Sequence, residues 1–444
     1  MCDHLRSRFT LTVTKQESIP LKKALILAYD FPPFNSIGGQ RPYAWLKYFR
    51  EFGLSPTVVT RHWDRKIKGP DDCNLPSIKT NVTEETSDYG KVIRAPFYPS
   101  LRDKLIVRND IPSVLLRKTL SVWQLLTEHY IRSSDNKRPI LEAACEYLKQ
   151  NKVDVIIACG EPFVLFRYAA ELSREFETPW VGDYRDGWST NYRWDDARFY
   201  GLIQKSVQQK VEKRIVSSAK ILTTAAPSFS KRLAKLTGRK PEDIPVIYNG
   251  YFEEKFNGLD NIPLKKKFSI THAGTLYYFQ RVETFFNGLN LFLEQNPTAE
   301  VEVTFYGLNF YPTQIDRIKA AVGNADVTFT DKMPHDEILK ELVSSHVQLL
   351  LATPEKHQIY AKVFDYIATG RPILMVENDK GPLEEILSER ENSAIHSTAE
   401  GVANYLKESY FNPSNQQSVV NTDDTFTRRN QTRRFAELIL KAID

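Results

Sequence analysis

Two charged side chains in the last third of the sequence have the spacing of neighbours on a helix. Lys362 and Asp365 lie three residues apart in a stretch that ends at Gly370. This i, i+3 spacing places the ammonium and the carboxylate on one helical face. The lysine could meet a phosphate group there, while the carboxylate accepts hydrogen bonds from ribose hydroxyls. A surface ion pair explains the same spacing equally well.

A second candidate anion site follows an apolar run at Phe268–Ala273. The chain continues with Gly274, Thr275 and Leu276, and Arg281 stands at the start of the next predicted helix. A strand end, a glycine, a hydroxyl and a guanidinium together suit a diphosphate. The alternative is that Arg281 is a solvated helix residue.

Paired glycines mark the loop after the first predicted strand. Gly38 and Gly39 precede Arg41 there, and paired glycines let backbone N–H groups approach an anion at a helix N-terminus. A plain turn would use the same residues. The loop matches neither the G-x-G-x-x-G nor the Walker A pattern, so neither a nicotinamide enzyme nor a P-loop ATPase is favoured.

A cluster of acids, arginine and tryptophan follows another predicted strand, at residues 179–183. It contains Asp183, Arg185, Asp186 and Trp188. Ligands bind at the carboxyl ends of strands in open α/β sheets, and these side chains could handle a sugar hydroxyl and its ring face. A structural Asp–Arg pair at the strand end is the alternative.

Strand and helix signals alternate along most of the chain, which predicts two doubly wound, Rossmann-like α/β domains. The first βαβ unit joins strands at residues 23–30 and 56–60 through a helix with Trp45, Phe49 and Phe52 at i, i+4 and i+7, ending near Gly53. Further strands are predicted at residues 153–158, 179–183, 220–224, 245–248, 268–273, 300–306, 325–329, 347–352 and 371–376.

These signals also predict the domain boundaries. We expect a leader at residues 1–20, an N-terminal domain at 21–248, a linker at 249–267, a second domain at 268–426 and a final helix at 427–444. Residues 97–138 interrupt the pattern with a basic and aromatic insertion, in which leucines and Trp123 could form an amphipathic helix. This helix could pack on the domain with its charges solvated, or contact a membrane surface or a lipid-linked acceptor.

The composition excludes several classes of protein. The net charge of +5 arises from 60 basic and 55 acidic residues, which argues against a dedicated nucleic-acid-binding protein. The four cysteines form no C-x-x-C pair, so a reducing cytoplasm fits best. No apolar run approaches the ~18 residues of a membrane helix. We therefore expect a soluble cytoplasmic protein, with peripheral contact on the inner face of the membrane as an additional expectation.

Four segments in this order resemble the retaining glycosyltransferase family 4, which has the GT-B fold, and within it the bacterial enzymes of surface-polysaccharide assembly. Each segment is loose alone, but the four together are specific, and both domains contribute to them. The segments are Tyr29-Asp30-Phe31-Pro32-Pro33 with Gly38-Gly39-Gln40-Arg41, Asp183-Tyr184-Arg185-Asp186-Gly187-Trp188, His272-Ala273-Gly274-Thr275-Leu276 with Arg281, and Lys362-Val363-Phe364-Asp365-Tyr366 through Gly370-Arg371-Pro372.

The resemblance implies a cleft between the domains and transfer of a sugar, with retention, from a nucleotide diphosphate sugar to a saccharide or lipid-linked acceptor. The nucleotide would be held mainly by the second domain, with no cofactor and no metal. The expected site residues are Asp183, Arg185, Asp186, Arg281 and Lys362 for catalysis, Gly38, Gly39, Gly274, Thr275, Met333 and Asp365 for the donor, and Arg41 and Trp188 for the acceptor.

The sequence departs from the family pattern in two places. His357 stands where the family often has a glutamate that contacts the donor sugar, and residues 183–188 lack the histidine that many members carry near the reacting carbon. No D-x-D occurs, which speaks against a metal-dependent GT-A enzyme. A nucleotide-sugar epimerase, a phosphorylase or a catalytically inactive nucleotide-binding partner are the competing hypotheses.

Overall fold

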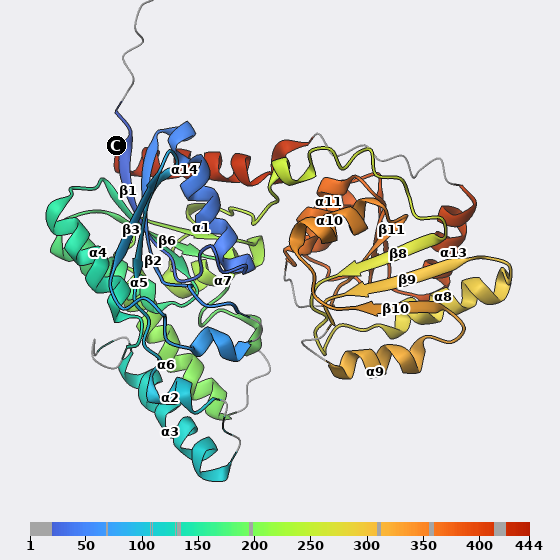
Figure 1. The fold of residues 1–444 in the computed structure, drawn as a ribbon, viewed down its shortest axis with the longest axis horizontal. Helices are drawn as coiled ribbons and strands as arrows, with labels where there is room; N and C mark the ends of the chain where they lie inside the picture. Colours follow the sequence, from blue (N-terminus) through green and yellow to red (C-terminus); the bar gives the residue numbers. More distant parts are fainter. Residues whose placement is uncertain are drawn as a thin grey trace, which may run out of the picture.

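The computed structural model describes residues 20–67, 70–106, 108, 110–128, 130, 135–194, 199–308, 312–354, 359–412 and 423–444. Most of the predicted leader and His357 lie outside these residues. The chain folds into two α/β domains that lie side by side, joined by two chain segments and by the C-terminal helix (Figure 1). The predicted fold class is confirmed.

The first domain is built on one sheet, to which the described residues contribute seven strands in the order β3-β4-β2-β1-β5-β6-β7. All pairs are parallel except β3 with β4. The order reverses between β1 and β5, which is the switch point at which ligands bind in open α/β sheets. The strands are β1 Lys22–Leu27, β2 Leu54–Arg61, β3 Thr83–Ser87, β4 Gly90–Ala95, β5 Val155–Gly160, β6 Trp180–Tyr184 and β7 Ile221–Thr224.

Helices cover both faces of this sheet, so its central strands read as continuous apolar runs. Leu25 and Leu27 of β1 face one core cluster, and Ala24 and Ile26 face the other. The second cluster includes Phe435 from the C-terminal helix, which therefore packs on the first domain. The helices are α1 Ile37–Tyr48, α2 Leu101–Lys104, α3 Ile111–Thr127, α4 Arg138–Gln150, α5 Val164–Glu175, α6 Phe199–Val216, α7 Pro227–Thr237 and α14 Arg428–Ile443.

The second domain repeats the plan around a parallel sheet with the order β10-β9-β8-β11-β12-β13 in the described part of the chain. Its switch point lies between β8 and β11. The strands are β8 Phe268–Ala273, β9 Val301–Tyr306, β10 Asp326–Thr330, β11 Val347–Leu351, β12 Ile373–Val376 and β13 Ser393–His396. The helices are α8 Glu283–Gln295, α9 Pro312–Ala321, α10 His335–Val343, α11 Lys362–Thr369, α12 Pro382–Ser388 and α13 Ala399–Phe411.

The two chain segments that cross between the domains are hydrogen-bonded to each other. Tyr251 donates its N–H to the carbonyl of Phe426 at 3.0 Å, and Arg428 donates to the carbonyl of Tyr251 at 2.7 Å. Gly250 permits this close approach, because its φ is +65° and a Cβ there would lie 2.4 Å from the Phe426 oxygen. The crossing is therefore a paired connection between the domains.

Most predicted strands are confirmed, and one is wrong. Residues 245–248 form only an isolated bridge from Val246 to Thr224. The carbonyls of Ile247 and Tyr248 instead accept hydrogen bonds from Arg41, and the Tyr248 N–H donates to the Gln431 side chain. Side chains thus form hydrogen bonds with backbone N–H and C=O groups that would otherwise pair with a neighbouring strand.

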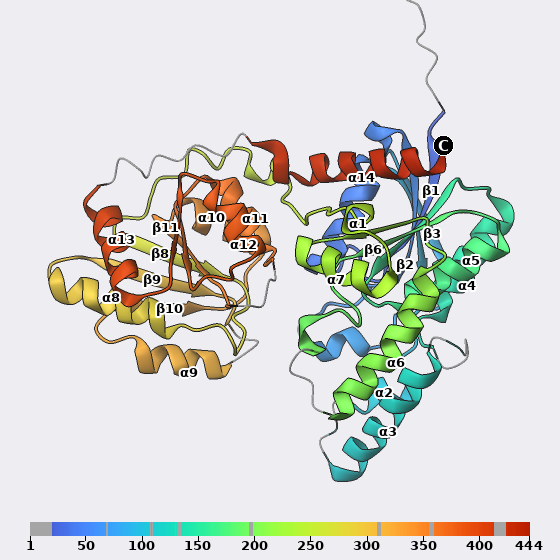
Figure 2. The same cartoon turned by 180° about the vertical axis from the view of Figure 1, so that it is seen from behind.

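The insertion forms two helices at one end of the first domain, where α2 and α3 lie beside α6 (Figures 1 and 2). The α3 side chains that face the domain include polar ones, since Ser113 is buried and Arg117 donates to the carbonyl of Ile106. Several of its apolar residues face outward, since Ile111 is 83% and Trp123 57% exposed, whereas Val114 and Leu120 are half-buried. Among the described residues, no helix is long and apolar enough to cross a membrane.

Candidate active site

Arg185 lies where the first strand of the first domain gives way to α1. Its Nη1 is 3.6 Å from Asp30 Oδ2, and Ser36 donates to the same carboxylate oxygen at 3.0 Å. Ser36 also caps α1 by accepting the N–H of Gly39 at 2.9 Å. A Cβ on Gly38 would lie 1.4 Å from Arg185 Nη1, so glycine is needed for the guanidinium to lie against the helix start. The structure brings Gly38, Gly39 and Arg185 together.

Arg41 and Asp183 form a bidentate ion pair inside the first domain. Arg41 Nε donates to Asp183 Oδ2 at 2.7 Å and its Nη2 to Oδ1 at 2.6 Å. Thr223 donates to Oδ1 at 2.7 Å, and the Arg41 side chain is 2% and that of Asp183 0% exposed. This geometry makes the pair a positioning element that ties α1 to β6. The predicted roles of Arg41 at the acceptor and of Asp183 in catalysis stay predictions.

Asp186 and Trp188 lie on opposite sides of the same loop. The Asp186 side chain is 47% exposed, with Oδ2 3.9 Å from Arg185 Nε. Trp188 is buried, donates to Gln208 Oε1 at 2.5 Å and stacks on Phe163 with ring centroids 5.1 Å apart. Trp188 also lines a cavity in the first domain.

In the second domain, Lys362 begins α11 and reaches the turn after β8. Its Nζ lies 3.0 Å from His272 Nε2 and 3.1 Å from the carbonyl of Thr275. His272 Nδ1 lies 2.9 Å from the carbonyl of Leu349, so this nitrogen carries the proton and Nε2 accepts from the ammonium. Gly274 has φ +86°, and a Cβ there would lie 3.5 Å from Lys362 Cε.

The protonation states of this pair follow from its burial. Desolvation lowers the pKa of Lys362 to about 7. Burial, and then the charge of Lys362, lowers the pKa of His272 well below its ordinary value. His272 is therefore neutral, whereas Lys362 is poised to take up a proton when an anion arrives.

The predicted catalytic residue Arg281 and the predicted donor-binding residue Met333 differ in their surroundings. Arg281 is exposed, and within the described residues no hydrogen bond or ion pair engages its guanidinium. Met333 is half-buried in the loop between β10 and α10. That loop passes near Gly274, because a Cβ on Gly307 would lie 3.8 Å from Gly274 Cα and 4.0 Å from Lys332 Cα. The residue next to Met333, Lys332, thus lies in a loop close to the Lys362 turn, whereas Arg281 is exposed without a partner among the described residues.

Asp365, the predicted ribose ligand, lies at the side of the second domain that faces the first. His335 Nε2 is 3.0 Å from Asp365 Oδ2. Arg428 of α14 lies near this carboxylate and donates to Gln40 of α1 at 2.8 Å. Burial lowers the pKa of Arg428 to about 9, and the charge of Asp365 partly offsets that effect. Arg428 thus connects α1 with the donor half of the site.

His272, His335 and Glu161 lie at the candidate site but were not predicted as site residues from the sequence. His272 and His335 contact Lys362 and Asp365 directly. Glu161 follows β5 at the switch point, and its exposed carboxylate has no hydrogen bond or ion pair with the described residues. Its place at the end of the predicted strand at residues 153–158 was the available signal for Glu161.

The two halves supply different chemistry. The second domain offers a glycine turn, a lysine that binds a proton near neutral pH and a carboxylate, which together match a nucleoside diphosphate. The first domain offers a fixed arginine, a capped helix start and exposed carboxylates at the strand ends. Such an arrangement can bind an anion on one side and hydroxyl groups on the other.

Comparison with known proteins rests on structure alone. No protein-family model matches the sequence, and no curated protein matches it. Many solved structures are similar to this chain. Those compared cover nearly the whole chain at low sequence identity.

Three of them illustrate the likeness. A sucrose-phosphate synthase from Thermosynechococcus elongatus is 14% identical, with a TM-score of 0.53 over 95% of this chain and 96% of its own. HepE from Anabaena, in complex with UDP-glucose, is 13% identical, with a TM-score of 0.53 over 95% and 97%. An α,α-trehalose-phosphate synthase from Burkholderia xenovorans, in complex with glucose-6-phosphate, is 10% identical, with a TM-score of 0.58 over 95% and 100%. The chain therefore has the fold of these GT-B glycosyltransferases.

Proposed function

We propose that this protein is a glycosyltransferase that moves a sugar from a nucleotide diphosphate sugar to a hydroxyl of an acceptor. The observation that carries the proposal is the Lys362 ammonium, 3.1 Å from the Thr275 carbonyl and beside Gly274 at the carboxyl end of β8. This is the switch-point edge of the second sheet, where a diphosphate would lie. Solved structures of the same fold include transferases bound to UDP-glucose and glucose-6-phosphate.

In the proposed reaction the acceptor oxygen forms a bond to the anomeric carbon of the donor. The bond between that carbon and the diphosphate oxygen breaks, and its electron pair leaves with the nucleoside diphosphate. The acceptor hydroxyl loses its proton to the leaving diphosphate or to solvent. Lys362 would stabilise the negative charge on the departing oxygens, which is the largest contribution that a fixed cation can make.

Four finer features belong to this proposal. Retention of configuration, membership of glycosyltransferase family 4 and a role in surface-polysaccharide assembly follow from the sequence resemblance described above. Metal independence follows from the lysine and the helix start, which supply positive potential near the diphosphate without a metal ion. Arg281, Asp365, Gly274, Thr275 and Met333 are the further residues proposed around the donor.

Millimolar UDP, GDP or ADP is expected to raise the melting temperature, because a preformed site binds only the folded state. The increase should shrink between about pH 6 and about pH 8. The anion favours the ammonium form of Lys362, whose pKa is about 7 in the free protein, so affinity is greatest below that pH and falls above it. Differential scanning fluorimetry across this pH range measures both effects.

The Lys362→Ala variant is the control for the pH effect, since the nucleotide's own phosphate also titrates near this range. The wild-type protein should lose more nucleotide stabilisation than the variant as the pH rises. A protein that none of the three nucleotides stabilises would have no donor site. A pH dependence equal in the two proteins would remove Lys362 from that site.

Contact with an anionic membrane is a second part of the proposal. The outer face of α3 presents Ile111, Leu115 and Trp123 to solvent, with Lys118 on the same helix exposed. Leu202 of the adjacent α6 is also exposed. Apolar side chains can insert shallowly at an interface, and each nearby Lys or Arg adds about 1 kcal/mol at an anionic surface. We therefore propose that α3 docks on anionic lipid headgroups, near a lipid-linked acceptor.

The wild-type protein is expected to sediment with vesicles that contain anionic lipid at low salt, and to stay in the supernatant with neutral vesicles. High salt should weaken this binding because it screens the lysine and arginine charges. Trp123→Glu should reduce sedimentation. Phe411→Glu, on an equally exposed ring of the second domain, is the matched control. Equal recovery in the supernatant with both kinds of vesicle would leave α3 without a membrane role.

A further inference from the structure

A cavity of about 470 Å³ lies in the first domain, next to the ends of β5 and β6. Its size falls in the range of roughly 300–1,000 Å³ that is typical of small-molecule sites. The loop after β5 forms one side with Glu161 and Phe163. Gln124 of α3 and Gln204 of α6 also line it, so the insertion helix forms part of a cavity beside the switch point.

Three aromatic rings line this cavity. Phe163 and Trp188 stack nearly parallel, with an interplanar angle of 3°. Trp194 lies beside them, is half-buried and donates to the carbonyl of Trp188 at 3.0 Å. Because Phe163 and Trp188 are buried against each other, Trp194 is the ring of the three that offers a partly exposed face. An aromatic face next to amide and carboxylate groups suits a ligand that has an apolar face and a rim of hydroxyl groups.

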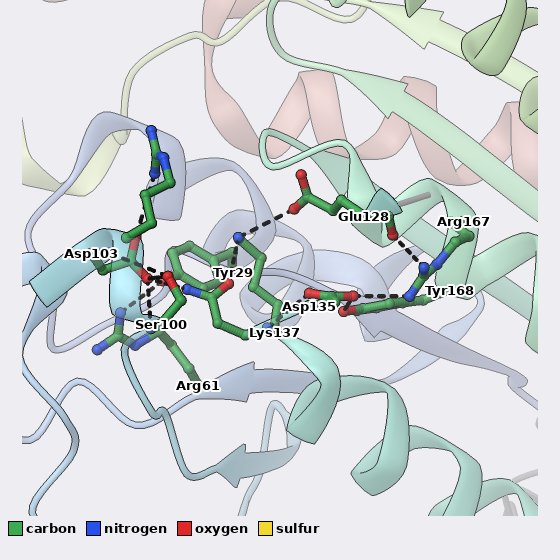
Figure 3. Close-up of polar contacts among 11 residues, drawn as sticks. Tyr29, Arg61, Ser100, Asp103, Glu128, Asp135, Lys137, Arg167 and Tyr168 are labelled. Atoms are coloured by element: carbon green, nitrogen blue, oxygen red, sulfur yellow. Dashed lines mark hydrogen bonds and ion pairs between the residues drawn. The ribbon is translucent and has the colours of Figure 1, made fainter. Parts of the chain in front are cut away.

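The only basic residue among the described lining residues is Lys137, and its charge is already balanced. Lys137 Nζ lies 3.5 Å from Glu128 Oε1 and donates to Asn136 Oδ1 at 2.9 Å. Figure 3 shows Lys137 beside Glu128 and Tyr29, in the network that braces this wall. Glu161 adds a carboxylate that interacts electrostatically with Arg185, whose guanidinium also faces Asp30 at 3.6 Å and Asp186 at 3.9 Å, so this end of the cavity keeps more negative than positive groups.

The same wall is held by a second buried pair. Arg167 Nη2 lies 2.9 Å from Asp135 Oδ2, and its Nη1 donates to the carbonyl of Glu128 (Figure 3). Tyr168 donates to the Asp135 carboxylate. Because Arg167 holds the backbone of Glu128, the position of the Glu128 carboxylate in this wall is fixed. The cavity is therefore preorganised and carries an excess of negative charge.

We infer that this cavity binds a pyranose without phosphate or carboxylate groups, as the acceptor of the proposed transferase. The partly exposed Trp194 ring would stack on the sugar face, and Glu161, Gln124 and Gln204 would meet its hydroxyls. The role of the pyranose as acceptor rests on the proposed function. Binding of the pyranose itself does not require a donor. The polar wall of α3 faces this cavity, opposite to its exposed apolar face.

Saturation-transfer NMR with methyl β-D-glucopyranoside as the probe tests the cavity directly. The neutral glycoside should bind. Glucose-6-phosphate should bind at least about fivefold more weakly, because its phosphate meets the negative charge of Glu161. Trp194→Ala should weaken glycoside binding by about tenfold. Trp123→Ala, on the outer face of the same region, should leave it unchanged.

The Glu161→Gln variant tests whether the charge of Glu161, rather than the shape of the cavity, disfavours the phosphorylated sugar. It should bring glucose-6-phosphate close to the neutral glycoside in affinity, because the amide keeps hydrogen-bonding capacity without the charge. A wild-type protein that prefers the phosphorylated sugar, or that binds neither sugar while UDP still raises its melting temperature, would overturn the inference and leave the donor assignment intact. Glycoside binding without any nucleotide effect would instead count against the proposed function.

Discussion

Replacing Lys362 with alanine is expected to lower kcat/KM by about 10²-fold or more. The ammonium lies at the turn after β8, 3.1 Å from the Thr275 carbonyl and 3.0 Å from His272 Nε2. It would therefore stabilise the leaving diphosphate more in the transition state than in the ground state. Nucleotide release from the donor, measured at several donor concentrations, gives kcat and KM separately.

The loss should not come from unfolding. Desolvation lowers the pKa of Lys362, so the ammonium makes the fold less stable rather than more stable near neutral pH. The melting temperature of the variant should therefore stay near that of the wild-type protein. Lys407→Ala, on the exposed side of α13, is the matched control and should turn over normally. Normal turnover of the Lys362 variant itself would exclude this residue from leaving-group stabilisation.

Breaking the buried pair between Arg41 and Asp183 is expected to cost about 3–5 kcal/mol of unfolding free energy. Arg41→Met leaves the Asp183 carboxylate uncompensated at 0% exposure, and it also frees the carbonyls of Ile247 and Tyr248. For a domain of this size the melting temperature should fall on the order of 10 °C. Urea unfolding followed by fluorescence measures the free energy.

The double variant Arg41→Met/Asp183→Leu distinguishes positioning from catalysis. Removal of both charges should recover much of the lost stability, because no unpaired buried charge remains. If the pair only positions α1 and β6, this variant should fold and keep much of its turnover. A well-folded double variant that binds UDP but transfers no sugar would show that the pair does more than position α1 and β6.

The strand pattern was predictable where strands are buried on both faces. The prediction at Phe268–Ala273 agrees with β8, and Gly370 ends α11 in the left-handed conformation, as its position indicated. Three strands were missed, β3, β4 and β13. β3 and β13 are only partly buried or exposed and lack an apolar run, and in β4 Lys91 and Arg94 stand on either side of the buried Val92 and Ile93. Periodicity detects buried apolar runs rather than hydrogen bonding, so strands without such a run can escape it.

The site was less predictable than the fold, for two physical reasons. The sequence places Asp183 and Arg185 side by side at a strand end, but only the structure shows that Asp183 points at Arg41, 142 residues away. Similarly, the leucines and Trp123 predicted an amphipathic helix at residues 97–138, yet Ile111, Leu115 and Trp123 of α3 are exposed while polar Ser113 and Thr127 are buried. Periodicity gives a helix two faces and does not say which one the domain buries.

The central claim is that the Lys362 turn binds a nucleotide diphosphate sugar and releases its nucleotide during transfer. The most direct measurement is nucleotide release from a panel of UDP- and GDP-sugars, in the presence of EDTA, with and without a neutral glycoside as acceptor. We predict release from at least one donor, faster with the acceptor and about 10²-fold slower in Lys362→Ala. Complete absence of release from the whole panel, even after Mg²⁺ or Mn²⁺ is restored, would contradict the account.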